Sequence, residues 1–232
     1  MAAHPSNFES ESDMKKPFNI LNIIMIAIVL ISNIVYITSG NIDLKGVTSG
    51  LFAIMGLVNL CYAVVRRSYK LAFAILMFIG LVSSMLGDIL ITGNFIIGAA
   101  LFGVGHLMYL IGYFTLSRIS WNDVAFGGAI FVAVAMFMAF YPSFNFGGLD
   151  VVCYGYAFII SCMVGKAIGN HLKLRSTLTL VLALGSVLFA LSDVMLLFYV
   201  FGAAPKIIDY VCICAYYPAQ CLLAYSIYRA VK

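Results

Sequence analysis

The sequence predicts an all-α, polytopic membrane protein with about eight transmembrane helices. Hydrophobic residues make up 64% of the 232-residue chain and charged residues only 9%, a composition far outside the range of soluble domains. The mean hydropathy is +1.08, and runs of about 20 apolar residues, each able to cross roughly 30 Å of hydrocarbon, recur along nearly the whole chain. The first run resembles the later ones and is too long to be a cleaved signal peptide.

Polar segments divide the chain into these spans. Residues 1–14 are polar and rich in Ser and Glu, and we expect them to form a disordered tail ahead of a single transmembrane domain, residues 15–232. The spans are bounded in chain order by Lys15-Lys16-Pro17, the basic stretch 66–70, a Gly93-Asn94 turn, Pro142 and the polar stretch 170–175. We expect the spans at about Phe18–Thr38, Val47–Val65, Leu71–Thr92, Phe95–Ser117, Val124–Tyr141, Leu149–Ile168, Thr177–Phe201 and Ile207–Tyr228.

Positive charges predict how the chain crosses the membrane. Of the 13 Lys and Arg residues, Lys45 and Lys206 fall on one side and the other eleven on the side of the N-terminus. By the positive-inside rule both termini are expected in the cytoplasm, which requires an even number of spans. The net charge of +4 is scattered rather than clustered, so nucleic acid is not an expected partner. The expected location is the bacterial inner membrane or the endoplasmic reticulum.

Two similar segments predict an internal repeat. Gly80 precedes Asp88 by eight residues, and Gly185 precedes Asp193 by the same number. Each aspartate is followed by an apolar span end, a short turn and a helix with polar aromatic residues. An offset of four spans keeps the chain direction, so we interpret the protein as two parallel four-helix repeats about an axis along the membrane normal. The alternative is a chance likeness between apolar helices.

Asp88 and Asp193 are carboxyl groups inside apolar spans, where an unpartnered charge costs several kcal/mol. From the helical rise, Asp88 lies roughly 6 Å and Asp193 roughly 10–12 Å from the outer end of its span. If the repeats pack face to face, the two carboxyls share one cavity, and one protonated acid beside one ionised partner is the arrangement that acid–base catalysis uses. Carboxyls that hydrogen-bond helices together, or that relay protons in a transporter, fit the same pattern.

His106 is the only one of the three histidines that lies inside a span. One histidine cannot build a multi-histidine zinc site, so neither a metal nor another cofactor is expected. We expect His106 to make an interhelical hydrogen bond, which is compatible with orienting Asp88. Tyr109 and Tyr113 follow at i+3 and i+7 on the same helix face. The six cysteines all lie in apolar spans without zinc-type spacing and are expected to pack as small apolar residues.

The last span carries Tyr216-Tyr217-Pro218-Ala219-Gln220, in which the proline frees a backbone carbonyl and bends the helix, so that nearby polar groups can line a cavity. Tyrosines at this spacing can also serve packing alone. Ser192 has no Gly-x-Ser-x-Gly elbow and no histidine on its turn, so we do not interpret it as a nucleophile; it can bond back to its own helix. Lys166, near the inner end of its span, is expected to snorkel to the cytoplasmic surface.

Two ordered groups of residues carry a resemblance to a known family. The first is Gly87-Asp88-x-Leu90 followed by Phe95-x2-Gly98-x3-Phe102-x2-Gly105-His106-x2-Tyr109. The second is Gly185-x3-Phe189-x2-Ser192-Asp193 together with Tyr216-Tyr217-x-Ala219-Gln220. From about Leu71 to the C-terminus the chain thus resembles the YhhN-like lysoplasmalogenase family. It departs from that family in the second span, where we find no lysine–proline pair of the kind that members often carry at the start of an early span.

The resemblance implies eight helices and hydrolysis of the vinyl ether bond of a lysoplasmalogen to a fatty aldehyde and glycerophospho-ethanolamine or -choline. Vinyl ethers are cleaved by protonation of the β-carbon to an oxocarbenium ion that water captures, which needs a desolvated acid and a nearby anion. We therefore expect Asp88 and Asp193 to be catalytic. The residues expected to bind substrate are His106, Tyr109, Tyr113, Ser192, Tyr216, Tyr217 and Gln220.

Two other classes of function fit the same sequence. A proton- or cation-coupled transporter, or a lipid-handling protein, could use the same aspartates, and parallel repeats also suit transport. A structural or receptor-like membrane protein would need no chemistry at either aspartate. The expected partners are a lysophospholipid substrate and membrane lipids, and a homodimer is compatible with the sequence.

Overall fold

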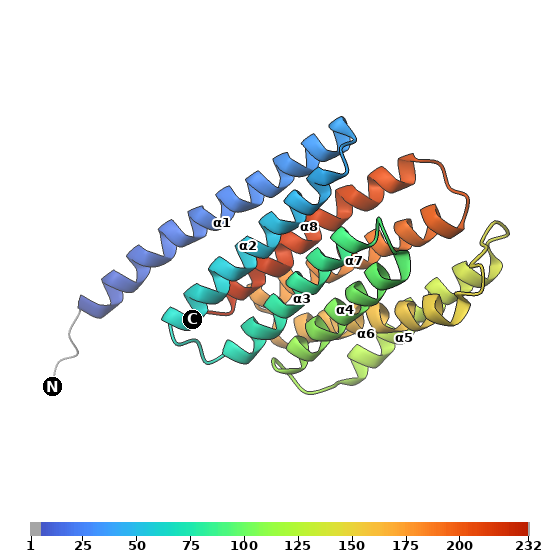
Figure 1. Ribbon diagram of the computed structural model, residues 1–232. Coiled ribbons are helices and arrows are strands. Elements are labelled where there is room, and N and C mark those ends of the chain that lie inside the picture. Colours follow the sequence, from blue (N-terminus) through green and yellow to red (C-terminus); the bar gives the residue numbers. More distant parts are fainter. Residues whose placement is uncertain (1–5, 232) are drawn as a thin grey trace.

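The structure is a computed structural model that describes the backbone of residues 6–231 and the side chains of residues 16–231. The described residues form eight α-helices and no strand, and all eight are long and apolar enough to cross a membrane (Figure 1). This confirms the predicted fold class. The helices are α1 Ser6–Ser39, α2 Asp43–Val65, α3 Leu71–Leu90, α4 Phe95–Phe114, α5 Trp121–Phe140, α6 Asp150–Leu174, α7 Thr177–Phe201 and α8 Ile207–Arg229.

Helix α1 is longer than the predicted first span. Its backbone begins at Ser6, although its apolar run begins only after Lys16. Residues 6–14, which we expected to belong to a disordered tail, are the first turns of this helix, and residues 1–5 lie outside the described residues. Helix α6 also exceeds its prediction, because it continues to Leu174 rather than ending near Ile168.

Successive helices run in opposite directions, so the start of α1 and the end of α8 lie at the same end of the bundle (Figure 1). A chain that crosses the membrane an even number of times begins and ends on the same side, and the distribution of positive charges predicts such an even number. The opposite end of the bundle holds the starts of α2, α4, α6 and α8. We call it the Lys45 end, after the lysine in the first turn of α2. Asp88, two residues before the end of α3, lies close to it.

The contacts between helices fit two four-helix repeats. Within each half the helices pack in chain order, from α1 to α4 and from α5 to α8. Between the halves α4 packs against α6, and α8 packs against α2, which is the equivalent pair. The glycine before each aspartate marks a close approach to the next helix. A Cβ on Gly80 would collide with the Tyr109 ring of α4, and one on Gly185 would press on Leu223 of α8.

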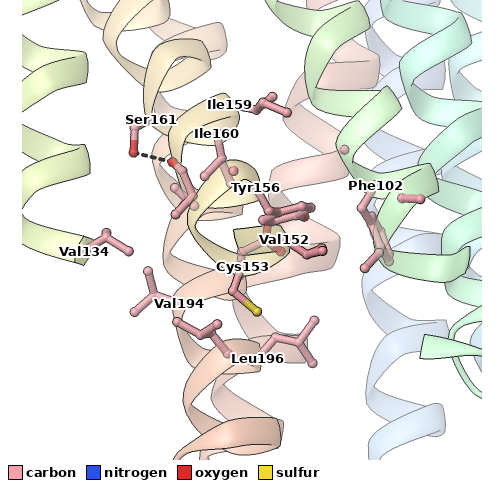
Figure 2. Close-up of a pocket in the computed structure, with 18 of the residues that line it drawn as sticks. Phe102, Val134, Val152, Cys153, Tyr156, Ile159, Ile160, Ser161, Val194 and Leu196 are labelled. Carbon is pink, nitrogen blue, oxygen red and sulfur yellow. Dashed lines mark hydrogen bonds between the residues drawn. The ribbon is translucent and has the colours of Figure 1, made fainter. Parts of the chain in front are cut away.

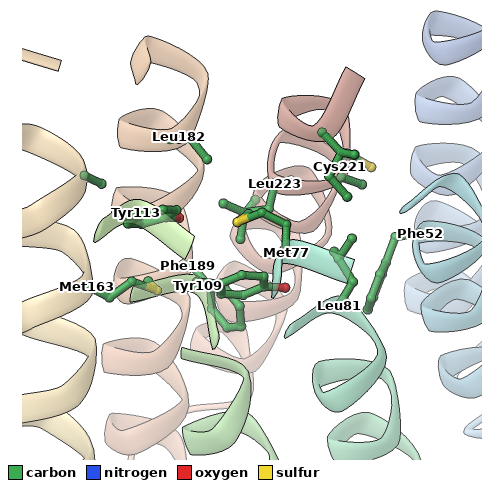
Figure 3. Close-up of a cluster of buried hydrophobic side chains, with 14 of the residues drawn as sticks. Phe52, Met77, Leu81, Tyr109, Tyr113, Met163, Leu182, Phe189, Cys221 and Leu223 are labelled. Carbon is green, nitrogen blue, oxygen red and sulfur yellow. The ribbon is translucent and has the colours of Figure 1, made fainter. Parts of the chain in front are cut away.

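One buried core joins the helices that carry the polar residues described below (Figure 3). Its largest fully buried side chains include Phe52 on α2, Met77 on α3, Tyr109 on α4 and Phe189 on α7. Helices α1 and α5 bury only 17% of their apolar windows, against 50% for α3, α6 and α8, so they lie at the edge of the bundle. In hydrocarbon such a core is stabilised by close packing and interhelical hydrogen bonds.

Lys166 on α6 is buried, which corrects the expectation that it snorkels to the surface. Its side chain is 1% exposed, and its Nζ lies 2.8 Å from Oδ2 of Asp123 on α5. Nζ also donates to the Ser117 hydroxyl at 3.2 Å and to the Arg118 carbonyl at 3.0 Å. All three ammonium hydrogens therefore have partners, which is the condition for tolerating a buried charge. The ion pair joins α5 to α6, and the other two hydrogen bonds join α6 to the α4–α5 connection.

The predicted Gly93-Asn94 turn joins α3 to α4. The Asn94 side chain caps α4 by accepting a hydrogen bond from the backbone N–H of Ile97 at 3.1 Å. This capped start fixes which residues of α4 face the other helices. His106, roughly three turns further on, faces α6 and α7, whose Tyr156 and Asp193 it contacts.

Candidate active site

Asp88 on α3 is a buried carboxyl group held by three donors from two other helices. Its side chain is 3% exposed, and Oδ1 lies 3.3 Å from Nζ of Lys45 on α2. Oδ2 accepts from the hydroxyl groups of Ser49, one turn further along α2, and of Tyr216 on α8, both at 2.6 Å. The ammonium group balances the carboxylate charge and the hydroxyls satisfy its remaining lone pairs, so the carboxylate is tolerated away from water.

Gln220 and Tyr109 extend this hydrogen-bond network away from Asp88. Nε2 of Gln220 donates to the Tyr216 hydroxyl at 3.1 Å, and the Tyr109 hydroxyl donates to Oε1 of Gln220 at 3.0 Å. Because the Tyr216 oxygen accepts from Gln220, its own hydrogen is directed to Asp88. Gln220 and Tyr109 therefore position Tyr216.

Asp193 on α7 has a different set of partners. Its Oδ2 accepts from the Tyr156 hydroxyl on α6 at 2.7 Å and lies 3.0 Å from Nε2 of His106 on α4. Nε2 and the Tyr156 hydroxyl are 2.8 Å apart, so the three groups form a closed triangle. Asp193 is 11% exposed, and no lysine or arginine pairs with it within residues 16–231. Whether Nε2 donates to Oδ2 or accepts from it is set by the tautomer of His106 and by the protonation of Asp193.

The structure therefore corrects the expected partner of His106. The sequence was compatible with His106 orienting Asp88, whereas the ring contacts Asp193. The reason is the packing of α4. Its His106 face meets α6 and α7, while Tyr109, one turn on, reaches Gln220 of α8. Hydropathy does not report which helices surround α4, so spacing alone could not distinguish the two aspartates.

The two carboxyl groups are held in equivalent ways, as two repeats predict. Each accepts from a hydroxyl on the helix that precedes its own helix within the same half. Each also contacts a side chain from the last helix of the other half. The hydroxyl groups from the same half are those of Ser49 for Asp88 and Tyr156 for Asp193, and the contacting side chains from the other half are Tyr216 for Asp88 and His106 for Asp193.

The surroundings of the two aspartates differ one helical turn before the Ser49 and Tyr156 hydroxyl groups. Lys45 lies four residues before Ser49, whereas Val152 lies four residues before Tyr156. Asp88 consequently has an ammonium counter-ion, and the corresponding position beside Asp193 is apolar. The two halves thus share a scaffold but surround their carboxyl groups with different chemistry.

Asp88 and Asp193 both line one cavity of about 200 Å³ between the two halves. Lys45, Tyr216 and Tyr217 line it too. The volume is well above the ~15 Å³ that one water requires, so water and a polar fragment of a ligand can reach both carboxyls. The shared cavity matches the prediction from face-to-face repeats. Within the described part of the chain, no three His, Cys, Asp or Glu side chains gather closely enough to hold a metal ion.

The predicted substrate-binding residues separate into two groups. Tyr216, Tyr217 and Ser192 line the shared cavity. The Ser192 hydroxyl lies 3.3 Å from Sγ of Cys212, and the Tyr217 hydroxyl lies 3.3 Å from that of Ser49.

Tyr109, Tyr113 and Gln220 are fully buried and are not among the residues that line this cavity. The Tyr113 hydroxyl lies 2.8 Å from that of Ser186 on α7. In the structure these three residues make hydrogen bonds to other side chains, and the expectation that they bind substrate stays a prediction. His106 is buried as well, and it reaches the cavity through Asp193.

Lys45, Ser49 and Tyr156 were missed by the sequence reasoning. Lys45 served only as a charge on the outer side, although it stands at the start of the second span, followed by Gly46 rather than proline. For Ser49 and Tyr156 the sequence held one weak signal, which is a similar separation from the aspartate that each contacts. Ser49 precedes Asp88 by 39 residues, and Tyr156 precedes Asp193 by 37.

Comparison with known proteins places these residues in a family. The model of the YhhN family matches residues 48–227, which include both aspartates, His106, Tyr156 and Tyr216. Lys45 lies just before the matched segment. No curated protein and no solved structure matches the chain. Because the match covers most of the chain and all eight helices can span a membrane, we conclude that this multi-pass membrane protein belongs to the YhhN family.

Proposed function

We propose that this protein is a lysoplasmalogenase, a membrane hydrolase that cleaves the vinyl ether bond of lysoplasmalogens by acid–base catalysis at Asp88 and Asp193. The main support is the cavity that both carboxyl groups line. Membership of the YhhN family and the membrane-spanning helices agree with it. The products are a fatty aldehyde and glycerophospho-ethanolamine or glycerophosphocholine.

In this proposal Asp193 is the acid and Asp88 the anion. Lys45 is a counter-ion for Asp88 at 3.3 Å. Asp193 instead contacts His106 and Tyr156, two groups that can exchange a proton with it. An acid without a lysine counter-ion, in the same cavity as an anion that Lys45 compensates, fits a reaction in which positive charge develops on the substrate.

The reaction begins when Asp193 gives its proton to the β-carbon of the double bond, whose electron pair forms the new C–H bond. This leaves an oxocarbenium ion at the α-carbon, which the Asp88 carboxylate stabilises. Water adds to the α-carbon and loses a proton to Asp193, giving a hemiacetal. The hemiacetal loses its hydroxyl proton as the glycerol oxygen gains one, which releases aldehyde and the glycerophospho alcohol. One water is consumed and Asp193 is again protonated.

The test is aldehyde release from a lysoplasmenyl lipid by protein purified in detergent, without any gradient. The wild-type protein should cleave the vinyl ether and leave the matching acyl lysolipid intact. Asp88→Asn and Asp193→Asn should each lower turnover by about 10²- to 10⁴-fold, the usual contribution of a general acid or base. Asp150→Asn is the matched control, because Asp150 is an exposed carboxyl at the Lys45 end that does not line the shared cavity. It should keep full turnover.

A transporter is the outcome to be favoured if purified wild-type protein releases no aldehyde. In that event the same aspartates should support uptake of a labelled substrate into proteoliposomes under a proton gradient. Full turnover in both aspartate variants would refute the carboxyl mechanism while leaving the hydrolase activity in place.

A further inference from the structure

An apolar groove adjoins the carboxyl groups from the side of α4 to α7. It has a volume of about 780 Å³, within the range of small-molecule sites. Figure 2 shows Val134 of α5 and Phe102 of α4 on either side of it, with Val152 and Tyr156 of α6 between them. Among its lining side chains, the ionisable ones in reach of the polar cavity are Asp193 and Tyr156.

The groove and the polar cavity are neighbours with shared lining. Five residues line both of them, namely Ile91, Phe95, Phe102, Asp193 and Leu196. Asp193 is the only carboxyl in this shared set, whereas Asp88 and Lys45 line the polar cavity alone. A ligand that occupied both spaces would therefore have an apolar part, a polar part and its junction beside Asp193.

The groove is elongated along the helices. On α6 its lining runs from Val151 to Val164 and on α7 from Val187 to Phe201, which corresponds to about 20 Å of helix. This is about two thirds of the roughly 30 Å thickness of a bilayer's hydrocarbon. Val104, Leu107, Val187 and Leu191 line it and are exposed side chains, so the groove is open rather than enclosed. A hydrocarbon chain could therefore enter sideways between helices.

We propose that this groove holds the hydrocarbon chain of a single-chain lysophospholipid, with the polar part of the lipid in the cavity of Asp88 and Lys45. The identity of the cleaved bond rests on the function proposed above, but occupation of the groove does not. With the chain so placed, the first carbons of the chain lie beside Asp193. In a vinyl ether these include the β-carbon, the atom that receives the proton. The groove therefore explains why the carboxyl without a lysine partner is the acid.

Glycines allow the groove to be blocked without a clash. Gly155 of α6 lines the groove, and a Cβ placed on it would meet nothing within 4 Å. Gly155→Phe therefore projects a ring into open space. Gly128 of α5 has the same freedom, is exposed, and is not among the groove residues. Gly128→Phe is accordingly the matched control.

The experiment uses a 1-O-alkyl lysophosphatidylcholine with a diazirine in its chain. Its saturated ether has no double bond to protonate, so labelling reports binding alone. Irradiation with full-length protein in detergent, followed by mass spectrometry, should place the label on α4, α6 and α7 groove residues. Unlabelled lysolipid should compete and diacyl phosphatidylcholine should not. Gly155→Phe should weaken labelling by about tenfold or more, about 1.4 kcal/mol, and Gly128→Phe should not.

Three results would overturn the inference. They are labelling spread over the outward faces of α1 and α5, equal competition by diacyl lipid, and groove labelling that Gly155→Phe leaves unchanged. The wild-type labelling map decides the matter even if Gly155→Phe fails to fold. Groove labelling in a protein that releases no aldehyde would refute the proposed hydrolysis alone. Aldehyde release without groove labelling would refute the groove alone.

Discussion

The ammonium group of Lys45 lies 3.3 Å from Oδ1 of Asp88, and Asp193 has no equivalent partner within residues 16–231. The two aspartates otherwise accept hydrogen bonds from equivalent helices. Lysine at one position and Val152 at its counterpart thus distinguish a carboxylate with a counter-ion from a carboxyl group that faces an apolar groove.

Replacing Lys45 with Met should impair catalysis more than folding. The Asp88 carboxylate would lose its counter-ion and no longer stay ionised during the reaction, so we expect kcat to fall by about 10²-fold. Lys45→Arg should retain part of the activity because it keeps the charge. Lys206→Met is the control, since Lys206 is exposed at the same end and lines neither the polar cavity nor the groove. Equal losses for Lys45→Met and Lys206→Met would contradict the role of the ion pair.

His106 and Tyr156 should act as a coupled pair. Both contact Oδ2 of Asp193 and each other. His106→Leu and Tyr156→Phe should each lower kcat with little change in KM. The double variant should lose less than the sum of the two, with a coupling energy of about 0.5–3 kcal/mol. The four proteins form a double-mutant cycle measured by aldehyde release, and simple additivity would argue against a shared function at Asp193.

Gly80→Ala should disturb the site from a distance. The added methyl group would collide with the ring of Tyr109, whose hydroxyl begins the network through Gln220 and Tyr216 to Asp88. We expect a destabilisation of about 1–3 kcal/mol and a lower kcat in the folded fraction. Thermal unfolding in detergent gives the first quantity. Gly50→Ala is the control, because a Cβ there meets nothing within 4 Å; a Gly80 variant as stable and active as this control would show that the contact is unimportant.

Lys166→Met should destabilise the bundle without a specific effect on the site. It leaves the Asp123 carboxylate buried and unpaired, which costs about 3–5 kcal/mol. Adding Asp123→Asn to the Lys166 variant removes that charge and should recover part of the lost stability. Unfolding of the single and double variants in the same detergent checks this. A double variant no more stable than Lys166→Met alone would mean that the charge pair is not the cause.

Hydropathy and spacing predicted the helices and the two intramembrane aspartates, because each leaves a periodic or local signal in the chain. Gly80 and Gly185 each mark a close approach to the next helix, which requires a small residue at both positions. The pairing of His106 with Asp193 was not predictable in this way, since it depends on the order of helices around the bundle.

The carboxylate partners of two lysines were not predicted, for a related reason. Lys45 and Lys166 each stand near the end of a span, where a lysine commonly reaches the surface. In the folded protein a carboxylate from another helix meets each of them, Asp88 and Asp123 respectively. Only the tertiary structure brings those carboxylates within range, so the sequence placed Lys166 at the cytoplasmic surface and counted Lys45 only as a charge on the outer side.

The most direct measurement is hydrolysis of a lysoplasmenyl lipid in deuterated water and, separately, in water enriched in ¹⁸O, followed by mass spectrometry of both products. The account predicts one deuterium on the carbon next to the aldehyde and no ¹⁸O in the glycerophospho product. It also predicts loss of this labelled aldehyde in Asp88→Asn and Asp193→Asn. Heavy oxygen in the glycerol hydroxyl, or undiminished labelling in both variants, would contradict protonation of the vinyl carbon by these carboxyl groups.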